Sequence, residues 1–219
     1  MNTNVKLEYL EPDKIEDRSF EIITQELNEM GIVLDAKEAP FIKRAIHTSA
    51  DFEYAQTLAF SKNAIEILKD LIKAGANVVT DTTMAFSGIN KTELSKNGGN
   101  AYCYMSDPDI NYAAHDLRVT RSYLCMKRGM KLEGPVIFVV GNAPTALMAI
   151  REEYDSGKYK PAFVIGVPVG FVNVVQTKEL ILETDIPYII NRGRKGGSNV
   201  AAALVNAALY EIRKEREDK

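Results

Sequence analysis

The chain has 219 residues and a mass of 24.3 kDa, and 27 Lys and Arg against 30 Asp and Glu give a formal net charge of −3. This acidic balance argues against binding to nucleic acid or to a membrane surface, because both need an excess of cations. The hydrophobic content of 46% excludes a disordered, collagen-like or disulfide-framework chain. The sequence contains no run of about 18 apolar residues, so we expect no membrane-spanning helix.

The N-terminus and the cysteines indicate the compartment. Met1–Asp17 carries five acidic residues and no apolar core, which is unlike a secretory signal peptide. Cys103 and Cys125 are too far apart for a CxxC pair and indicate reduced, buried thiols. We therefore expect a cytoplasmic protein. Two histidines and two scattered cysteines predict no zinc site.

Helical patterns dominate the first third of the chain. Apolar residues recur there at helical spacing, and Ser19 and Ser61 are placed as N-caps. Glycines follow two of the segments and stop them. The predicted helices are Ser19–Met30, Lys37–Ile46 and Ser61–Ala74.

Short apolar runs then alternate with helical segments. The runs predict buried strands at Asn77–Thr80, Ala101–Met105, Val136–Val140, Ala162–Val167 and Tyr188–Ile190. Their continuous hydrophobicity is typical of a parallel sheet covered on both faces. The helical segments between and after them are Ala113–Lys127, Ala143–Tyr154, Val174–Glu183 and Asn199–Arg213.

This alternation predicts an α/β fold, a doubly wound, mainly parallel sheet with helices on both faces and an N-terminal helical arm. No repeat and no convincing linker interrupts it. We expect a single domain over residues 1–219, with an N-terminal extension over 1–18 and a charged tail over 214–219.

Ligands of open α/β sheets bind beyond the carboxyl ends of the strands. Four loops follow such ends, at 81–88, 141–145, 168–173 and 191–199. The last loop carries Arg192, Arg194 and Lys195, with glycines that let the backbone approach a ligand and a helix start that presents N–H groups. It therefore predicts an anion site. The alternative is a basic loop that only faces solvent.

The nature of the anion follows from the glycine spacing. Loop 191–199 is not a Walker loop, and no G-x-G-x-x-G occurs in the chain. Nucleotide phosphate is therefore disfavoured, and carboxylates fit the loop equally well.

His47 is the candidate acid/base group. It follows Arg44 by three residues, so both side chains project from one face of a helix, and an imidazole exchanges protons near neutral pH. The alternative is a capping or surface histidine. His115 lies beside Asp116 in a polar helical stretch and is expected to be structural. The sequence contains no G-x-S-x-G elbow, so we expect no nucleophilic serine of that type.

At these same segments the sequence resembles the precorrin-8X and cobalt-precorrin-8 methylmutases of cobalamin biosynthesis. The resemblance runs from about Ile15 to Leu209. Its most specific parts are Gly-Asn-Ala-Pro-Thr-Ala-Leu followed by Pro-Val-Gly-Phe-Val. The matching stretches are Ile15–Phe20, Arg44–His47, Asp81–Met84 with Gly88, Thr120–Ser122, Gly141–Leu147, Pro168–Val172 and Gly193–Ser198.

The resemblance implies an isomerase that moves a methyl group from C11 to C12 of a corrin ring, giving hydrogenobyrinic or cobyrinic acid. It implies no methyl donor, no cofactor and no metal bound by the protein, because any cobalt arrives inside the substrate. The family's acid/base histidine falls on His47, which would protonate or hydrogen-bond the macrocycle near ring C. Family substrate contacts fall on Ser19 and Arg44, and the family is homodimeric.

The chemistry of the loops adds further candidate contacts. Arginine gives bidentate pairs with the carboxylates of a corrinoid, glycine allows close backbone approach, and apolar side chains can cover the ring faces. The added candidates are Thr82, Met84, Gly88, Arg121, Gly170, Phe171, Arg194, Lys195, Gly196 and Gly197.

Thr82, Ser87 and Lys195 depart from the aerobic pattern, and we favour the cobalt-containing substrate. Two other functions are weighed beside the mutase. A non-catalytic corrinoid carrier would keep the basic loop without needing His47. A nucleotide-dependent oxidoreductase would need a glycine motif that Gly166–Gly170 does not provide.

Overall fold

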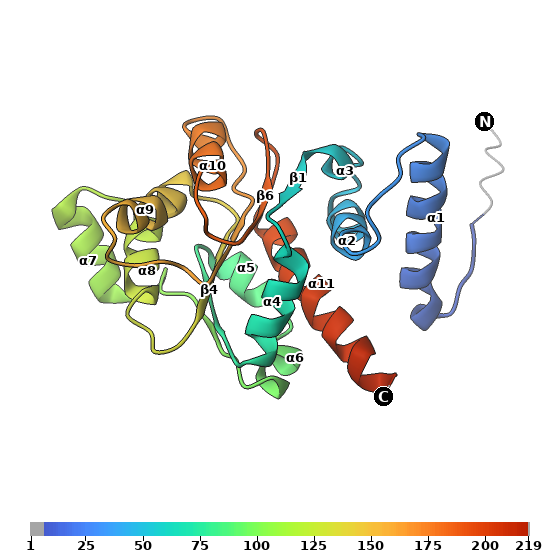
Figure 1. Ribbon diagram of the computed structural model, residues 1–219, viewed down its shortest axis with the longest axis horizontal. Coiled ribbons are helices and arrows are strands. Elements are labelled where there is room, and N and C mark those ends of the chain that lie inside the picture. Colours follow the sequence, from blue (N-terminus) through green and yellow to red (C-terminus); the bar gives the residue numbers. More distant parts are fainter. Residues whose placement is uncertain (1–6, 219) are drawn as a thin grey trace.

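The computed structural model describes residues 7–218, which form one six-stranded sheet in the order β1-β6-β5-β4-β2-β3 (Figure 1). β1 is antiparallel to β6, and the other neighbours are parallel. The strands are β1 (Leu58–Phe60), β2 (Asn77–Thr80), β3 (Ala101–Tyr102), β4 (Val136–Val140), β5 (Phe163–Gly166) and β6 (Tyr188–Asn191). The predicted mainly parallel, doubly wound sheet is confirmed.

Helices cover both faces of the sheet, as the sequence predicts (Figure 1). One face carries α7 (Pro108–Leu117), α8 (Arg121–Gly129), α9 (Pro144–Asp155) and α10 (Val174–Leu182). The other carries α2 (Ala39–Ser49), α4 (Ala64–Lys73), α5 (Thr83–Gly88), α6 (Lys91–Lys96) and α11 (Ser198–Glu217). A short 3-10 turn η1 (Pro12–Lys14), the outer helix α1 (Ile15–Glu29) and α3 (Tyr54–Thr57) complete the described elements.

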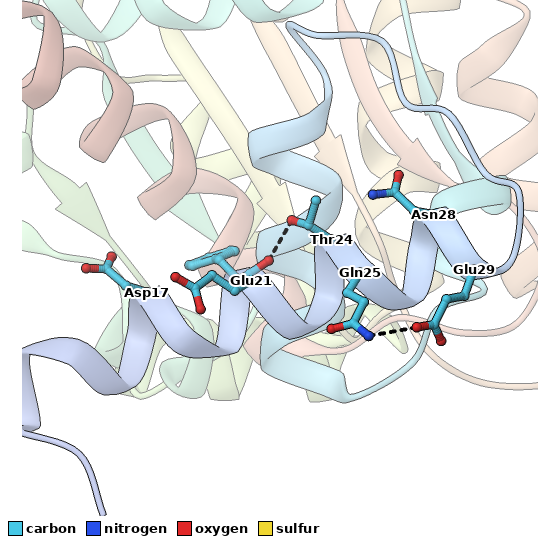
Figure 2. Close-up of a pocket in the computed structure, with 7 residues that line it drawn as sticks. Asp17, Glu21, Thr24, Gln25, Asn28 and Glu29 are labelled. Atoms are coloured by element: carbon cyan, nitrogen blue, oxygen red, sulfur yellow. Dashed lines mark hydrogen bonds between the residues drawn. The ribbon is translucent and has the colours of Figure 1, made fainter. Parts of the chain in front are cut away.

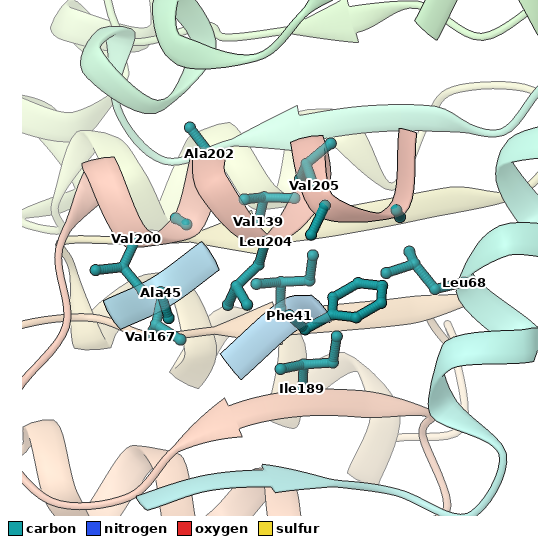
Figure 3. Close-up of a cluster of buried hydrophobic side chains, with 14 of the residues drawn as sticks. Phe41, Ala45, Leu68, Val139, Val167, Ile189, Val200, Ala202, Leu204 and Val205 are labelled. Atoms are coloured by element: carbon teal, nitrogen blue, oxygen red, sulfur yellow. The ribbon is translucent and has the colours of Figure 1, made fainter. Parts of the chain in front are cut away.

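The core on the α11 face depends on an alanine-rich helix. α11 is buried along most of its length between α2 and the sheet, and its small side chains let these neighbours approach closely. Figure 3 shows Phe41 of α2, Ile189 of β6 and Leu204 of α11 meeting in this layer. The outer helix α1 contributes less, through Ile23 and Leu27.

Both serines predicted as N-caps have other roles. α1 begins at Ile15, four residues before Ser19, and the Ser19 hydroxyl donates to the Ile15 carbonyl at 2.8 Å inside the helix. α4 begins at Ala64, and the Ser61 hydroxyl instead accepts from the Tyr188 backbone N–H at 2.9 Å. The assignment of a serine as N-cap therefore gave the wrong helix start twice, too late at Ser19 and too early at Ser61, because each hydroxyl bonds a different backbone group.

The predicted helix Ala113–Lys127 is two helices. Arg118 ends α7 in the left-handed conformation at φ 53°. Thr120 then caps α8, its hydroxyl oxygen accepting from the Tyr123 N–H at 3.2 Å. The predicted strand Ala101–Met105 keeps only its first two residues, as β3. Loop 81–88 is also more ordered than predicted, since most of it forms α5.

The charged tail predicted over 214–219 is helical up to Glu217. Glu215 accepts from the ammonium groups of Lys69 and Lys73 on α4, the second at 2.7 Å. These two hydrogen bonds lower the pKa of Glu215 to about 2. The end of α11 is thus attached to α4. Residue 219, and residues 1–6 of the predicted extension, lie outside the described part of the chain.

We predict that Glu215→Gln lowers the free energy of unfolding at pH 7 by about 0.5–1 kcal/mol, the range of a partly exposed ion pair. The folded pKa lies below the unfolded value of 4.5, so this contribution is complete above pH 4.5 and is lost as pH falls toward 2. Urea unfolding at pH 7, 4 and 3 tests this. Glu217→Gln, which removes only the 3.6 Å pair with Arg213, is the control. A pH-independent difference between the two variants would contradict the prediction.

Candidate active site

A buried carboxylate joins the loops at the carboxyl edge of the sheet. Asp81 follows β2, at the point where the strand order reverses between β2 and β4. Its two oxygens accept from the backbone N–H groups of Gly141, Asn142 and Ala143 at 2.8, 2.9 and 2.7 Å. Burial raises the pKa of Asp81, and the three N–H donors oppose that shift. The N-terminus of α9 is therefore neutralised by a protein carboxylate, and it does not remain open to an anion.

Two further contacts bring the N-terminus of α11 to this edge. The hydroxyls of Thr82 and Ser198 are 2.8 Å apart, and the Gly197 N–H donates to the Val167 carbonyl at 2.9 Å. The loops that follow β2, β5 and β6 therefore meet at the start of α11. This is the edge at which the sequence predicts a ligand site.

Beside this edge lies a cavity of about 520 Å³ between α2, α5 and α11. It is lined by Arg44, His47 and Thr48 of α2, by Met84, Ser87 and Gly88 of α5, and by Asn199, Ala202, Ala203, Asn206 and Tyr210 of α11. Four of the predicted site residues, His47, Arg44, Met84 and Gly88, are thus brought together. Met84 is exposed over 63% of its surface and offers an apolar contact.

His47 and Arg44 are positioned by aromatic rings. The His47 imidazole is exposed and stacks on the Phe20 ring at a centroid distance of 5.3 Å. The Arg44 guanidinium lies 4.7 Å from the centroid of Phe20 and 5.0 Å from that of Tyr210. Its Nη2 donates to a Glu16 oxygen at 2.8 Å, and this hydrogen bond lowers the pKa of Glu16. The arginine is thereby held in one orientation within reach of the cavity.

The basic loop forms a second group of predicted residues. The Arg194 guanidinium lies 5.5 Å from the Phe171 ring centroid, and the Gly170 N–H donates to the Arg194 carbonyl at 3.1 Å. Phe171 is 81% exposed. Lys195 instead pairs with carboxylates, at 2.6 Å from Asp51 and at 2.9 Å from Glu53. These pairs raise the pKa of Lys195, so this ammonium is already engaged by the protein.

The glycines of the site make room for protein contacts. A Cβ at Gly196, where φ is +157°, would lie 2.0 Å from the Val167 carbonyl oxygen. A Cβ at Gly88 would lie 2.9 Å from that of Ala202. The sequence prediction assigns these glycines to close approach of a ligand. In the structure, their small size is required by protein contacts, where the loop packs on the segment that follows β5 and where α5 packs on α11.

Two predicted contacts, Ser19 and Arg121, lie outside the lining of the cavity between α2, α5 and α11, as far as residues 7–218 define it. The Ser19 hydroxyl is bonded inside α1, and Arg121, the first residue of α8, donates to the Met105 carbonyl at 3.2 Å. Thr120 beside it shares a 2.6 Å hydroxyl contact with Thr145, which joins the start of α8 to that of α9.

A larger groove of about 870 Å³ runs along α1 (Figure 2). Its lining contains Asp17, Glu21 and Glu29, and no Lys or Arg of the described chain contributes to it. Such a surface repels carboxylates, so its size does not make it the anion site.

Sequence reasoning missed the contribution of α11 to the cavity. Asn199, Asn206 and Tyr210 lie on one stripe of that helix, with spacings of seven and four residues. Polar side chains at this spacing on an alanine-rich helix are the signal that could have identified them. The buried Lys178 of α10, inside an apolar segment, was also missed.

Residues 7–218 contain neither a metal-binding cluster nor a membrane-spanning helix. No three His, Cys, Asp or Glu side chains among them are grouped as a metal ion would require. None of the helices in this range is both long and apolar enough to span a bilayer.

We predict that Asp81→Asn lowers the free energy of unfolding by about 2–4 kcal/mol, because an amide leaves buried N–H donors of the α9 N-terminus without a charged acceptor. Denaturant unfolding at pH 7 measures the change. Asp185→Asn, at an exposed pair with Lys160, is the control and is expected to change the stability much less, because solvent screens that pair. Equal effects of the two substitutions would show that the loop junction is not held by Asp81.

Comparison with known proteins gives one consistent result. The family model described as precorrin-8X methylmutase matches residues 14–211. The chain is 43% identical to the cobalt-precorrin-8 methylmutase of Salmonella typhimurium, covering 93% of this chain and 97% of that protein. It is 36% identical to the precorrin-8X methylmutase of Pseudomonas aeruginosa, covering 89% and 93%. The solved precorrin-8X methylmutase of Thermus thermophilus superposes with a TM-score of 0.81 at 34% identity, covering 92% and 98%. The chain therefore belongs to the precorrin-8X methylmutase family of isomerases.

Proposed function

We propose that this protein converts cobalt-precorrin-8 into cobyrinic acid by moving one methyl group from C11 to C12 of the corrin ring. The bond from the methyl carbon to C11 breaks and a bond to C12 forms within the same molecule, so no methyl donor takes part. The observation that carries the proposal is the meeting of His47 and Arg44 in one cavity beside the carboxyl edge of the sheet.

His47 is proposed as the acid/base group. Its ring is exposed at the cavity and stacked on Phe20, an arrangement that limits its rotation. An imidazole can donate a proton or a hydrogen bond to the macrocycle near ring C at neutral pH, and this favours the tautomer that rearranges. The reacting bond lies within the substrate, so the protein supplies binding, orientation and this one proton.

The carboxylates of the substrate are assigned to the cations that face the site. Arg44 is already held in place by two aromatic rings and Glu16. Arg194 lies beside the exposed ring of Phe171, which can cover a face of the flat macrocycle. Arginine suits both positions because its planar guanidinium pairs with a carboxylate through two hydrogen bonds.

The cobalt-containing substrate and a cytoplasmic location complete the proposal. The relative with 43% identity carries the name cobalt-precorrin-8 methylmutase, and this supports the cobalt form over the metal-free one. Both cysteines are free thiols, which supports a reducing compartment. Cys125 is buried as predicted, whereas Cys103 is only half-buried.

We further propose that the protein is a homodimer. Val172 is 77% exposed beside Phe171, and both are large apolar side chains next to the site. A second subunit and the bound substrate together would cover these two exposed side chains.

We predict that light scattering at micromolar concentration gives twice the chain mass of 24.3 kDa. A monomer mass that persists up to 100 µM would contradict the dimer.

We predict that His47→Ala lowers kcat by about 10²- to 10⁴-fold, because the general acid/base group is removed, and leaves product binding within a few-fold. Anaerobic turnover of cobalt-precorrin-8 and of precorrin-8, followed by visible spectra, measures kcat, and titration with the cobyrinic product measures binding. His115→Ala is the matched control, because that side chain is 92% exposed. A wild-type protein that binds the ring with a spectral shift but never converts it would be a carrier.

A further inference from the structure

A lysine lies buried beneath the basic loop. Lys178 of α10 is fully inaccessible to solvent. Its ammonium donates to the Gly193 carbonyl at 2.8 Å and to the Lys195 carbonyl at 2.9 Å. Within residues 7–218 its hydrogen-bond acceptors are these two carbonyls, and it forms no ion pair with a carboxylate there. Burial lowers the pKa of Lys178 to about 8, and the negative charge of the neighbouring Glu179 opposes that shift only in part.

The loop is held through three consecutive carbonyl groups. The Gly193 and Lys195 carbonyls accept from Lys178, and the Arg194 carbonyl between them accepts from the Gly170 N–H at 3.1 Å. The Asn191 side-chain amide adds a second donor to the Lys195 carbonyl at 2.8 Å. Every carbonyl from 193 to 195 is therefore used by the protein.

The backbone N–H groups of the same loop do not bond to the protein. Within residues 7–218, those of Arg194, Lys195 and Gly196 have no protein acceptor. The Arg194 side chain projects beside Phe171 from the same three residues. Fixing the carbonyls on one side fixes the direction of these donors, which is how a backbone anion site is preorganised.

The free-energy cost of burying the Lys178 ammonium indicates that this side chain does more than fill space. Burying an ammonium without a carboxylate is unfavourable, and a methionine of similar length would fill the same volume without that charge. What methionine cannot do is donate to two carbonyls. The ammonium is therefore explained by the conformation of the loop.

We propose that Lys178 is a positioning residue, which holds the loop 193–196 so that Arg194 and the loop N–H groups meet a carboxylate of the corrinoid. This inference rests on the proposed function. Lys178 does not touch the substrate, so its effect is expected on binding and not on the methyl shift itself.

The test separates binding from stability. Lys178→Met is expected to raise KM for cobalt-precorrin-8, and Kd for the cobyrinic product, about tenfold, with kcat within about twofold. The melting temperature is expected to change by only a few degrees, because the lost hydrogen bonds and the relieved desolvation oppose each other. Lys178→Arg, which restores a charged donor, should recover part of the lost affinity. Lys160→Met removes an exposed lysine that pairs with Asp185, and it should leave KM unchanged.

A double-mutant cycle with Arg194→Ala tests the route of the effect. If Lys178 acts through the loop, its substitution changes KM by less than about twofold once Arg194 is absent. Equal KM effects in both backgrounds would overturn the proposal. So would a lowered melting temperature with unchanged KM, or failure of both Lys178 variants to fold, since each assigns the lysine to stability alone. Wild-type protein that converts neither substrate would refute the proposed function, whereas product Kd would still report on Lys178.

Discussion

The Asp81 carboxylate is the interaction on which the site depends. Parallel strands leave their carboxyl ends at one edge, and the chain turns to opposite sides after β2 and after β4. The three N–H groups that Asp81 accepts hold these diverging loops together and neutralise the N-terminus of α9. The N-terminus of α11 and the basic loop therefore remain as the electropositive part of this edge.

Much of the positive charge at this edge is paired with carboxylates of the protein or lies against its aromatic rings. Glu16 orients Arg44, and Asp51 and Glu53 engage Lys195. A chain of net charge −3 can in this way keep a local anion site without becoming a general polyanion binder. Lys178 extends the same principle to the backbone, because it fixes carbonyl groups so that N–H groups are presented.

The sequence predicted the parallel strands because buried strands such as β4 are continuous apolar runs. The three-residue antiparallel edge strand β1 was not predicted. The three-residue spacing of Arg44 and His47 also predicted that their side chains share one face of a helix. Helix starts at Ser19 and Ser61 were wrong, because a serine hydroxyl can satisfy itself on other backbone groups. The roles of Asp81 and Lys178 could not be predicted, since the Asp81 carboxylate bonds 60 residues away and the Lys178 ammonium bonds backbone carbonyls 15 and 17 residues away, in the loop after the next strand. Neither partner set has a local sequence pattern.

The central claim is that the corrinoid lies between the His47 cavity and the basic loop, with its carboxylates on arginine. The most direct test is a crystal structure of the protein with the cobyrinic product bound. We expect the His47 imidazole within hydrogen-bond distance of the macrocycle near ring C, and carboxylates paired with Arg44 and Arg194. A product bound at the opposite edge of the sheet, or with His47 remote from the ring, would contradict it.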